Sequence, residues 1–258
     1  MMMLGMALAP GADKPSPVCE AHSGPNTGAL VELYTSEGCS SCPPADRWLA
    51  RLAASANPRD LSLLAFHVDY WDEIGWPDRF AQRAFTLRQS QRVRAGGSTT
   101  IYTPQVMLSS QLGLRWNQPA QVAAAIAAIQ RRRATLSLQL RTRPESGRWL
   151  VELDALPTAG AAGAGQMYLA LYEDDLSSNV RAGENEGATL HHERVVRGLW
   201  GPWPVSAKGG ATRQLRVTPP PTAKTGKLGL TAFVQDPRTG ETLQALSLPL
   251  ETCATSLP

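Results

Sequence analysis

The chain has 258 residues, of which 25 are Lys or Arg and 22 are Asp or Glu, so its formal net charge is +3. This length allows one large domain or two ordinary ones, each with a core that forms without help from disulfides. Basic residues are spread thinly except at 131–133, where three arginines close an alanine-rich helical segment, as the helix dipole favours. The composition disfavours nucleic-acid binding. No segment after the N-terminus offers the roughly 20 apolar residues that a membrane span needs.

Residues 1–27 are predicted to be a leader followed by an extended segment. Met1–Ala9 is apolar enough for the hydrophobic part of a signal peptide but lacks the basic residues that precede one. Residues 10–28 are rich in Pro, Gly and Ser and show little periodicity. We expect a periplasmic or secreted protein whose signal peptide is truncated or incomplete in this sequence.

Strands and helices are predicted to alternate over residues 28–134. Continuous apolar runs indicate buried strands, and segments with helical periodicity indicate helices. The expected elements are a strand at 30–34, a helix at 45–55, a strand at 61–69, a helix at 79–94, a strand at 105–109 with a hairpin partner at 112–116, and a helix at 119–133. This order is that of a thioredoxin-like α/β domain.

Beyond Ala134 the pattern changes to short alternating segments separated by turn signals, which is typical of a β-sandwich. The predicted fold class is therefore an α/β thioredoxin-like domain at 28–134 followed by an all-β sandwich-like domain at 135–258. In this second half, 183–187 is predicted to be an acidic turn. His191 and His192 are adjacent on a strand and point to opposite faces, so they are not expected to share a metal ion.

The chemistry is predicted to lie at Cys39 and Cys42, which fall in the turn between the first strand and the first helix. A helix N-terminus favours a thiolate there. We expect Cys39 to be the exposed nucleophile and Cys42 to resolve the mixed disulfide. The prolines at 43 and 44 disfavour α geometry at the residue before each, so the helix is expected to begin late and to stabilise the thiolates less.

The sequence Tyr102-Thr103-Pro104 precedes the strand at 105–109, at the point where thioredoxin-like folds carry a cis-proline opposite the dithiol. The backbone of Thr103 would then pair with an extended substrate by strand addition. Tyr102 and Trp71 are further candidates for substrate binding. The alternative is a trans-proline that starts an edge strand.

Glu32 and His67 are candidates for a supporting role. Glu32 lies in the first strand and could take the proton of Cys42 as a buried acid, although one extra residue before the dithiol leaves open which face it occupies. His67 ends the second strand and is interpreted as a structural histidine, as a wall of the site, or as a ligand for Cu(I) with Cys39 and Cys42. Cys19 and Cys253 form a structural disulfide in an oxidising compartment, or are free thiols in the chain ends.

Four segments resemble an exported bacterial family catalogued as domain of unknown function 1223 and classed as thioredoxin-like. They are residues 30–46 (LVELYTSEGCSSCPPAD), 66–72 (FHVDYWD), 102–105 (YTPQ) and 183–185 (GEN). The resemblance covers most of residues 28–250. It implies the fold and export, but the family has no settled activity.

The residues point to thiol–disulfide exchange through Cys39 and Cys42 opposite a cis-Pro104, without a cofactor. The expected partners are protein thiols or disulfides and a redox partner protein, with no nucleic acid and no stable membrane insertion. Two alternatives stay open: a carrier of copper or another soft metal that uses the same thiols, and a non-catalytic binding module with a permanent disulfide. Whether the chain is an enzyme is left open.

Overall fold

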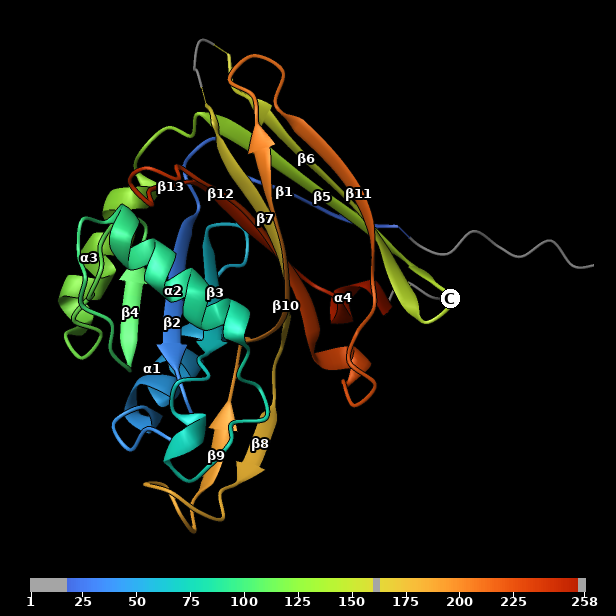
Figure 1. Cartoon of the computed structure of the whole chain (residues 1–258). Helices are drawn as coiled ribbons and strands as arrows, with labels where there is room; N and C mark the ends of the chain where they lie inside the picture. The colour runs from blue at the N-terminus through green and yellow to red at the C-terminus, as the bar shows by residue number, and fades with distance from the viewer. Residues whose placement is uncertain (1–17, 160–162, 255–258) are drawn as a thin grey trace, which may run out of the picture.

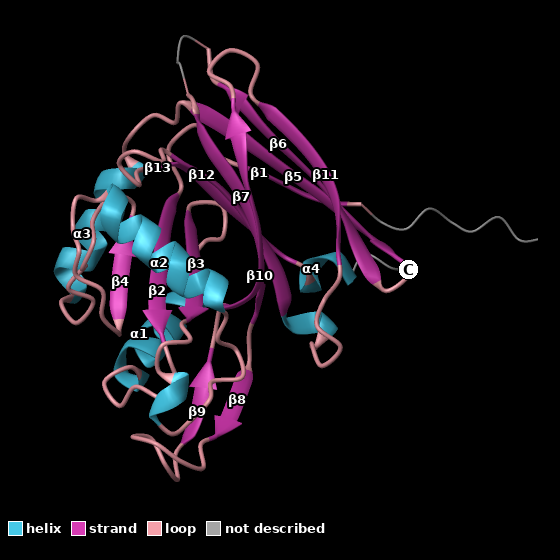
Figure 2. Ribbon diagram, viewed as in Figure 1, coloured by secondary structure: helices cyan, strands magenta, loops and turns pink. Residues whose placement is uncertain are grey.

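The structure is a computed structural model that describes residues 18–159 and 163–254. The described residues form mostly β structure (Figures 1 and 2). The strands are β1 (Cys19–His22), β2 (Ala29–Thr35), β3 (Leu61–His67), β4 (Gln105–Leu108), β5 (Leu136–Glu145), β6 (Arg148–Pro157), β7 (Gly165–Glu173), β8 (Leu176–Asn179), β9 (Thr189–His192), β10 (Val195–Val205), β11 (Ala211–Val217), β12 (Leu228–Gln235) and β13 (Thr242–Pro249). The helices are α1 (Pro43–Ser55), α2 (Arg83–Ala95), α3 (Pro119–Gln130) and α4 (Glu251–Ala254), with 3₁₀ turns η1 (Asp72–Ile74) and η2 (Thr225–Lys227).

The central element is a seven-stranded mixed sheet with the order β13-β12-β7-β10-β3-β2-β4. β2 runs parallel to β3 over its full length, and β4 pairs antiparallel with β2. β2 and β3 are buried at every position, as the continuous apolar runs predict for strands covered on both faces. Helices α1 and α3 cover one face and α2 covers the other (Figure 1).

The helices begin and pack as their sequences require. α1 and α3 each have proline at the start, where a helical N–H has no intrahelical partner. α1 turns Ala45, Trp48 and Leu49 inward against the odd-numbered residues of β2, whereas its other side faces solvent. This placement sets Cys42, the N-cap of α1, at the carboxyl end of β2.

A second core lies between the four-stranded sheet β1-β5-β6-β11 and the β7, β12 and β13 end of the large sheet. β5 alternates buried and exposed residues over most of its length, which is the pattern of a sheet with one wet face. Cys19 of β1 is joined by a disulfide to Cys253 of α4, 234 residues away in sequence. This bond ties the two ends of the described chain to the same core.

The predicted fold class is wrong. The large sheet contains strands from both halves of the chain, because β10 lies parallel beside β3 through the pair Val195 and Ala65 and brings β7, β12 and β13 with it. The structure is thus a mostly β assembly of several sheets rather than a thioredoxin-like domain followed by a separate sandwich. An apolar strand does not encode which strand pairs with its edge, so the pairing of β10 with β3 could not be predicted from the sequence. The boundary near Ala134 stays a prediction about folding units.

Two local expectations also need correction. Residues 112–116 form no strand in the described chain, because the amides of Gly113 and Leu114 both bond to the carbonyl of Val106 in a tight turn. Residues 19–22, expected to be extended leader, form β1. The rest of the expected leader, residues 1–17, lies outside the described residues. No helix in the described part of the chain is long and apolar enough to cross a bilayer.

Glu32 lies in a buried ion pair and not beneath the dithiol. It shares the α2 face of β2 with Leu30 and Tyr34, opposite the face that α1 covers. Its carboxylate accepts hydrogen bonds from Arg88 at 2.9 and 3.1 Å and pairs with Nε of Arg92 at 3.3 Å. The side chains of Tyr34 and Gln235 also donate to it, at 2.7 and 2.9 Å.

Burial by itself raises the pKa of Glu32, but the attraction of Arg88 and then of Arg92 outweighs it and lowers that pKa to about 2. An acid this strong is ionised at neutral pH and is held by two arginines. The proposed role of Glu32 as proton acceptor for Cys42 is therefore wrong, because the strand's alternation turns it to the other face.

We expect Glu32→Gln to lower the free energy of unfolding by about 3–5 kcal/mol at pH 7, because it leaves two buried guanidinium groups against a neutral amide. The folded pKa of Glu32 lies below its ordinary value of 4.5, so its contribution is complete above that pH and is lost as the pH falls towards 2. Urea denaturation at several pH values measures both effects.

The matched control is Glu241→Gln, which removes a carboxylate paired with Arg132 where both side chains are about two-fifths exposed (40% and 43%). Its loss should stay below about 1 kcal/mol. Equal losses in the two variants would mean that the buried pair does not stabilise the fold.

Candidate functional site

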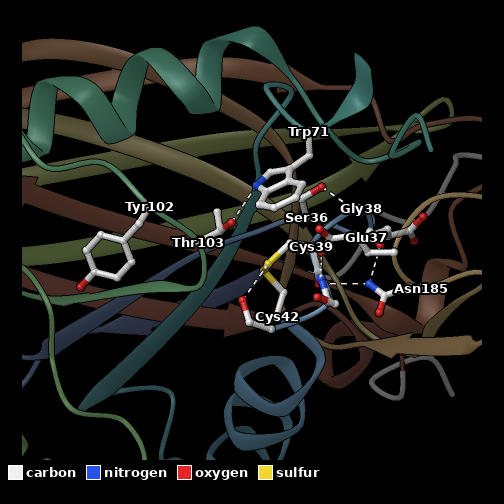
Figure 3. Close-up of a disulfide and its surroundings, with 12 residues drawn as sticks. Ser36, Glu37, Gly38, Cys39, Cys42, Trp71, Tyr102, Thr103 and Asn185 are labelled. Atoms are coloured by element: carbon white, nitrogen blue, oxygen red, sulfur yellow. Dashed lines mark hydrogen bonds between the residues drawn. A yellow bond between two sulfur atoms is a disulfide. The ribbon is translucent and has the colours of Figure 1, made fainter. Parts of the chain in front are cut away.

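The candidate site is the Cys39–Cys42 disulfide in the turn between β2 and α1 (Figure 3). The Cα atoms of the two cysteines are 5.4 Å apart. The turn is held by its own backbone, since the amide of Cys39 donates to the carbonyl of Ser36 at 3.2 Å and the amide of Cys42 to that of Cys39 at 3.1 Å. The local fold alone thus brings the two sulfur atoms together.

The start of α1 offers few donors to a thiolate. The helix begins at Pro43, two residues before the expected start at 45. The first two helical residues have no N–H, and the amides of Ala45 and Asp46 both donate to the carbonyl of Cys42, at 2.9 and 3.1 Å. Sγ of Cys39 contacts the hydroxyl of Ser41 at 3.3 Å. The first turn of α1 therefore offers few free N–H groups to a thiolate, but the expected reason is wrong, because Cys42 has α geometry and the helix begins directly after it.

Both cysteines are fully covered, with 0% exposure each, which contradicts the expectation that Cys39 is exposed. One part of the cover is Trp71, whose indole N–H donates to Oγ1 of Thr103 at 2.8 Å. Trp71 lies against the turn because residue 38 is glycine: a Cβ there would approach the Cβ of Trp71 to 3.2 Å. Trp71, a candidate for substrate binding, thus lies against the cysteine turn as part of its cover.

The second part of the cover is the 183–187 turn, which connects β8 to β9. The side-chain amide of Asn185 donates to the carbonyls of Glu37 and Cys39 at 2.8 and 3.0 Å (Figure 3). The carboxylate of Glu184 accepts a hydrogen bond from the amide of Ser40 at 2.9 Å. The 183–187 turn therefore binds the backbone on both sides of Cys39, although Cys39 and Asn185 are 146 positions apart in sequence.

Thr103 and Pro104 are joined by a cis peptide bond. Figure 3 draws Tyr102, Thr103 and Trp71 among the surroundings of the disulfide, with the Tyr102 ring directed away from the sulfur atoms. The backbone carbonyl of Tyr102 accepts a hydrogen bond from Gln89 at 2.9 Å, and its side chain is 43% exposed. The structure thus assembles Trp71 and Thr103 at the cover and leaves Tyr102 at the rim.

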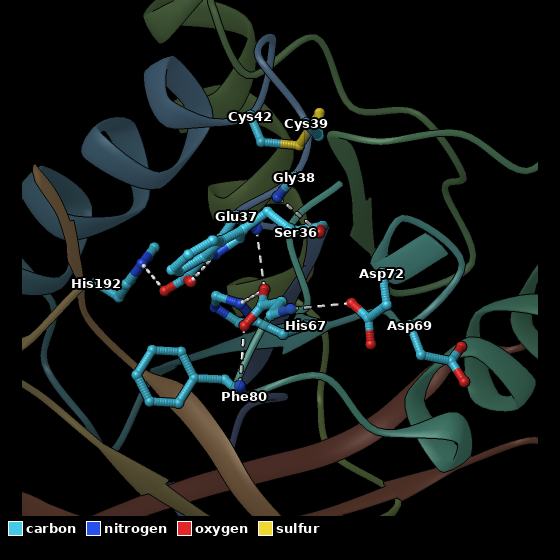
Figure 4. Close-up of polar contacts among 12 residues, drawn as sticks. Ser36, Glu37, Gly38, Cys39, Cys42, His67, Asp69, Asp72, Phe80 and His192 are labelled. Carbon is cyan, nitrogen blue, oxygen red and sulfur yellow. Dashed lines mark hydrogen bonds and ion pairs between the residues drawn. A yellow bond between two sulfur atoms is a disulfide. The ribbon is translucent and has the colours of Figure 1, made fainter. Parts of the chain in front are cut away.

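Beneath the turn lies a buried cluster of carboxylates and imidazoles (Figure 4). Glu37 accepts hydrogen bonds from the indole of Trp76 at 2.8 Å and contacts Nε2 of His192 at 3.1 Å. The backbone amide of Glu37 donates to Oδ2 of Asp78 at 2.9 Å, and the same oxygen contacts Nδ1 of His67 at 2.6 Å. The two imidazole rings lie edge to face with their centroids 5.0 Å apart.

Burial and neighbouring charges shift the pKa values of three groups in and beside the cluster. Burial lowers the pKa of His67, but the facing Asp78 carboxylate outweighs this and raises it above 6.5. In the same pair, burial raises the pKa of Asp78 while His67 lowers it, and the net direction is down. Burial raises the pKa of Asp46, which lies in the first turn of α1 and is opposed by His192 and His67.

His67 takes part in this cluster rather than in a cysteine-containing metal site. Its Nδ1 is engaged by Asp78, and Cys39 and Cys42 are bonded to each other. Within residues 18–159 and 163–254, no group of three or more His, Cys, Asp or Glu side chains is arranged to hold a metal ion. His192 is buried and His191 is exposed, as alternation along a strand requires.

Sequence reasoning missed Asp46, Asp78, Glu37 and Asn185 as parts of the site. Asp46 carries a usable signal, because it shares the inward side of α1 with Ala45 and Leu49. The contacts of Glu37 and Asn185 join residues 39 to 155 positions apart in sequence, and no local pattern encodes them.

We expect Asp78→Asn to lower the pKa of His67, because the burial that disfavours imidazolium remains while the attracting carboxylate is removed. In the wild type, the raised pKa of His67 contributes stability below its ordinary value of 6.5, which is lost as the pH rises through the folded value. NMR titration of the imidazole Cε1–H signal measures the shift. Asp72→Asn is the control, since an amide oxygen still accepts the Asp78 N–H at 3.0 Å. An unchanged His67 pKa in Asp78→Asn would contradict the pairing.

Two solved structures share this fold. Protein AGR_C_4864 from Agrobacterium tumefaciens matches with a TM-score of 0.63 and 23% sequence identity, over 88% of this chain and 96% of that one. HBP35 of Porphyromonas gingivalis matches with a TM-score of 0.64 and 13% identity, over 88% of this chain and 76% of the other. At these identities the likeness concerns the fold alone.

No curated protein matches the chain significantly. A family model does match, over residues 30–235, which include the cysteine turn, the Trp71 segment, the cis-proline and the 183–187 turn. The chain belongs to the family described as protein of unknown function (DUF1223).

Proposed function

We propose that the protein carries out thiol–disulfide exchange on other proteins through Cys39 and Cys42, behind a cover that must open first. The observation that carries the proposal is the nature of this cover. Trp71 packs against the core on the α2 side of β2, and the rest of the cover is held by side-chain hydrogen bonds from Trp71 and Asn185, which break at lower cost than a fully packed core.

The energetic cost of opening is modest. Each neutral hydrogen bond contributes about 0.5–1.5 kcal/mol net, and the groups that it releases are hydrated on opening. The cover joins the turn to two segments, the Trp71 connector and the 183–187 turn, that lie outside the main sheet. Such segments open locally without unfolding the core.

The exchange step is ordinary sulfur chemistry. A thiolate of the partner attacks Sγ of Cys39, the Cys39–Cys42 bond breaks, and Cys42 leaves as a thiolate that takes up a proton. A second thiol of the partner, once deprotonated, then displaces Cys39 from the mixed disulfide, so that the partner leaves oxidised and the pair is reduced. In the reverse direction the pair reduces a protein disulfide. We assign the partner to proteins that carry paired thiols.

The reduction potential is expected to lie towards the reducing end of the range. A thiolate stabilised by a helix N-terminus favours the reduced form, and Pro43 and Pro44 remove two of the amides that would supply this stabilisation.

The second disulfide, Cys19–Cys253, supports the proposal that the protein acts in an oxidising compartment.

A second candidate is a permanent structural disulfide in a binding module, and the complete burial of both cysteines favours it. In that case the bond stabilises the 36–42 turn and is reduced only when the protein unfolds. The two functions differ in how reduction responds to a change in the cover.

We expect Asn185→Ala to speed reduction of Cys39–Cys42 by dithiothreitol about tenfold, because it removes two hydrogen bonds that hold the cover. Alkylation of the released thiols followed by peptide mass spectrometry follows this bond separately from Cys19–Cys253. Asn179→Ala is the matched control, an amide on the preceding strand β8 that bonds to Thr189 at 2.9 Å. Equal rates in all three proteins, each matching the rate of global unfolding, would establish the structural disulfide instead.

A titration against defined glutathione ratios should give a reversible midpoint between about −300 and −200 mV. Pro43→Ala restores an N–H at the first helical position, so its midpoint should rise by about 10–30 mV. Pro119→Ala, at the same position of α3, should leave the midpoint unchanged. A pair with no midpoint above about −300 mV would contradict exchange as the function.

A further inference from the structure

A cleft of about 510 Å³ lies between the C-terminal half of α2, strands β7 and β10, and the turn that joins β12 to β13. It is lined by side chains of Arg88, Arg92, Arg94, Tyr168, Gln235 and Asp236, among others. In Figure 1 this half of α2 points away from the β8–β9 hairpin, whose connecting turn covers the disulfide. The cleft is thus a separate feature from the cysteine site.

The cleft carries more positive than negative charge. Arg88 and Arg92 are each only 5% exposed, and the single carboxylate of Glu32 serves both. Arg94 adds a third guanidinium at the rim. The acid that lines the cleft, Asp236, already pairs with Arg238 at 3.1 Å. The three guanidinium groups therefore face a single carboxylate, which leaves the cleft wall with two more positive than negative charges.

The wall also provides groups that orient a polar ligand and apolar surface for its body. The guanidinium of Arg88 lies 5.0 Å from the centroid of the Tyr168 ring, which stacks on Phe233 at 5.0 Å with an interplanar angle of 14°. The Tyr168 hydroxyl donates to the side chain of Gln166 at 3.0 Å and keeps its lone pairs as acceptors. Pro202 and Pro237 complete the rim.

The third property of the cleft is that its two buried arginines are held rigidly. Arg92 is fixed by the carbonyls of Ser109 and Gly240, and Arg88 by Glu32 and Gln235. Both guanidinium groups are therefore in place before any ligand arrives, which lowers the entropic cost of binding. A volume of this size lies in the range of small-molecule sites.

We propose that this cleft binds a small organic anion whose carboxylate or phosphate group faces Arg88 and Arg94 and whose apolar part lies along Tyr168. The inference stands apart from the proposed disulfide exchange, because it uses no residue of the cysteine site. It assigns a use to the arginine-rich face of α2 that the exchange function does not require.

Isothermal titration of the full chain with citrate and with glucose 6-phosphate tests the proposal at low salt, with glucose as the neutral reference. We expect at least one anion to bind with a dissociation constant in the millimolar range or tighter. Its affinity should fall as salt is added and should exceed the affinity for glucose. A preference for citrate or for the sugar phosphate identifies the anionic group.

Arg94→Gln should weaken that binding about fivefold, the effect of losing one partly exposed ion pair. Tyr168→Leu, which removes the ring face along which the apolar part of the anion lies, should also weaken binding, whereas Tyr168→Phe keeps the stacked ring and should leave binding unchanged. Arg83→Gln, an exposed arginine of the same helix outside the cleft, is the control and should leave binding unchanged. No binding of either anion, or equal effects of Arg94→Gln and Arg83→Gln, would overturn the proposal.

Discussion

The structure depends on the buried contact between Glu32 and the arginines of α2. This contact joins β2, α2 and, through Gln235, the end of β12, so it holds elements from both halves of the chain on one face of the large sheet. Buried charges of this kind are stable only when every partner is present. The same pair fixes the position of α2, and α2 forms one wall of the arginine-lined cleft.

The cysteine turn illustrates a different use of long-range contacts. Its backbone forms locally, but its cover comes from the connector after β3 and from the turn between β8 and β9. The buried cluster beneath it likewise joins Glu37 to His192 across 155 residues. Because these segments are bound by polar side chains, the geometry of the cover is specific and the strength of its contacts is moderate.

The two features occupy opposite faces of β2. Odd-numbered residues of β2 face α1, whose first turn begins at Cys42, and even-numbered residues face α2 and its arginines. The alternation of a single strand therefore places the cysteine pair on one side and the buried arginines on the other. A carboxylate at 32 serves the second face and has no direct part in the first.

The sequence by itself determined the local elements: β2, α1, β3, α2, β4 and α3 follow from apolar runs, helical periodicity and proline positions, and Cys39 and Cys42 fall in a turn because a strand and a helix flank them. Tertiary structure alone decided that β10 pairs with β3, that Glu32 contacts Arg88, and that Asn185 binds the backbone of the cysteine turn. The physical reason is the distance along the chain over which each interaction acts. Periodicity and capping act within a few residues, whereas the edge of a strand and the partner of a buried charge are chosen by packing among segments that lie far apart along the chain.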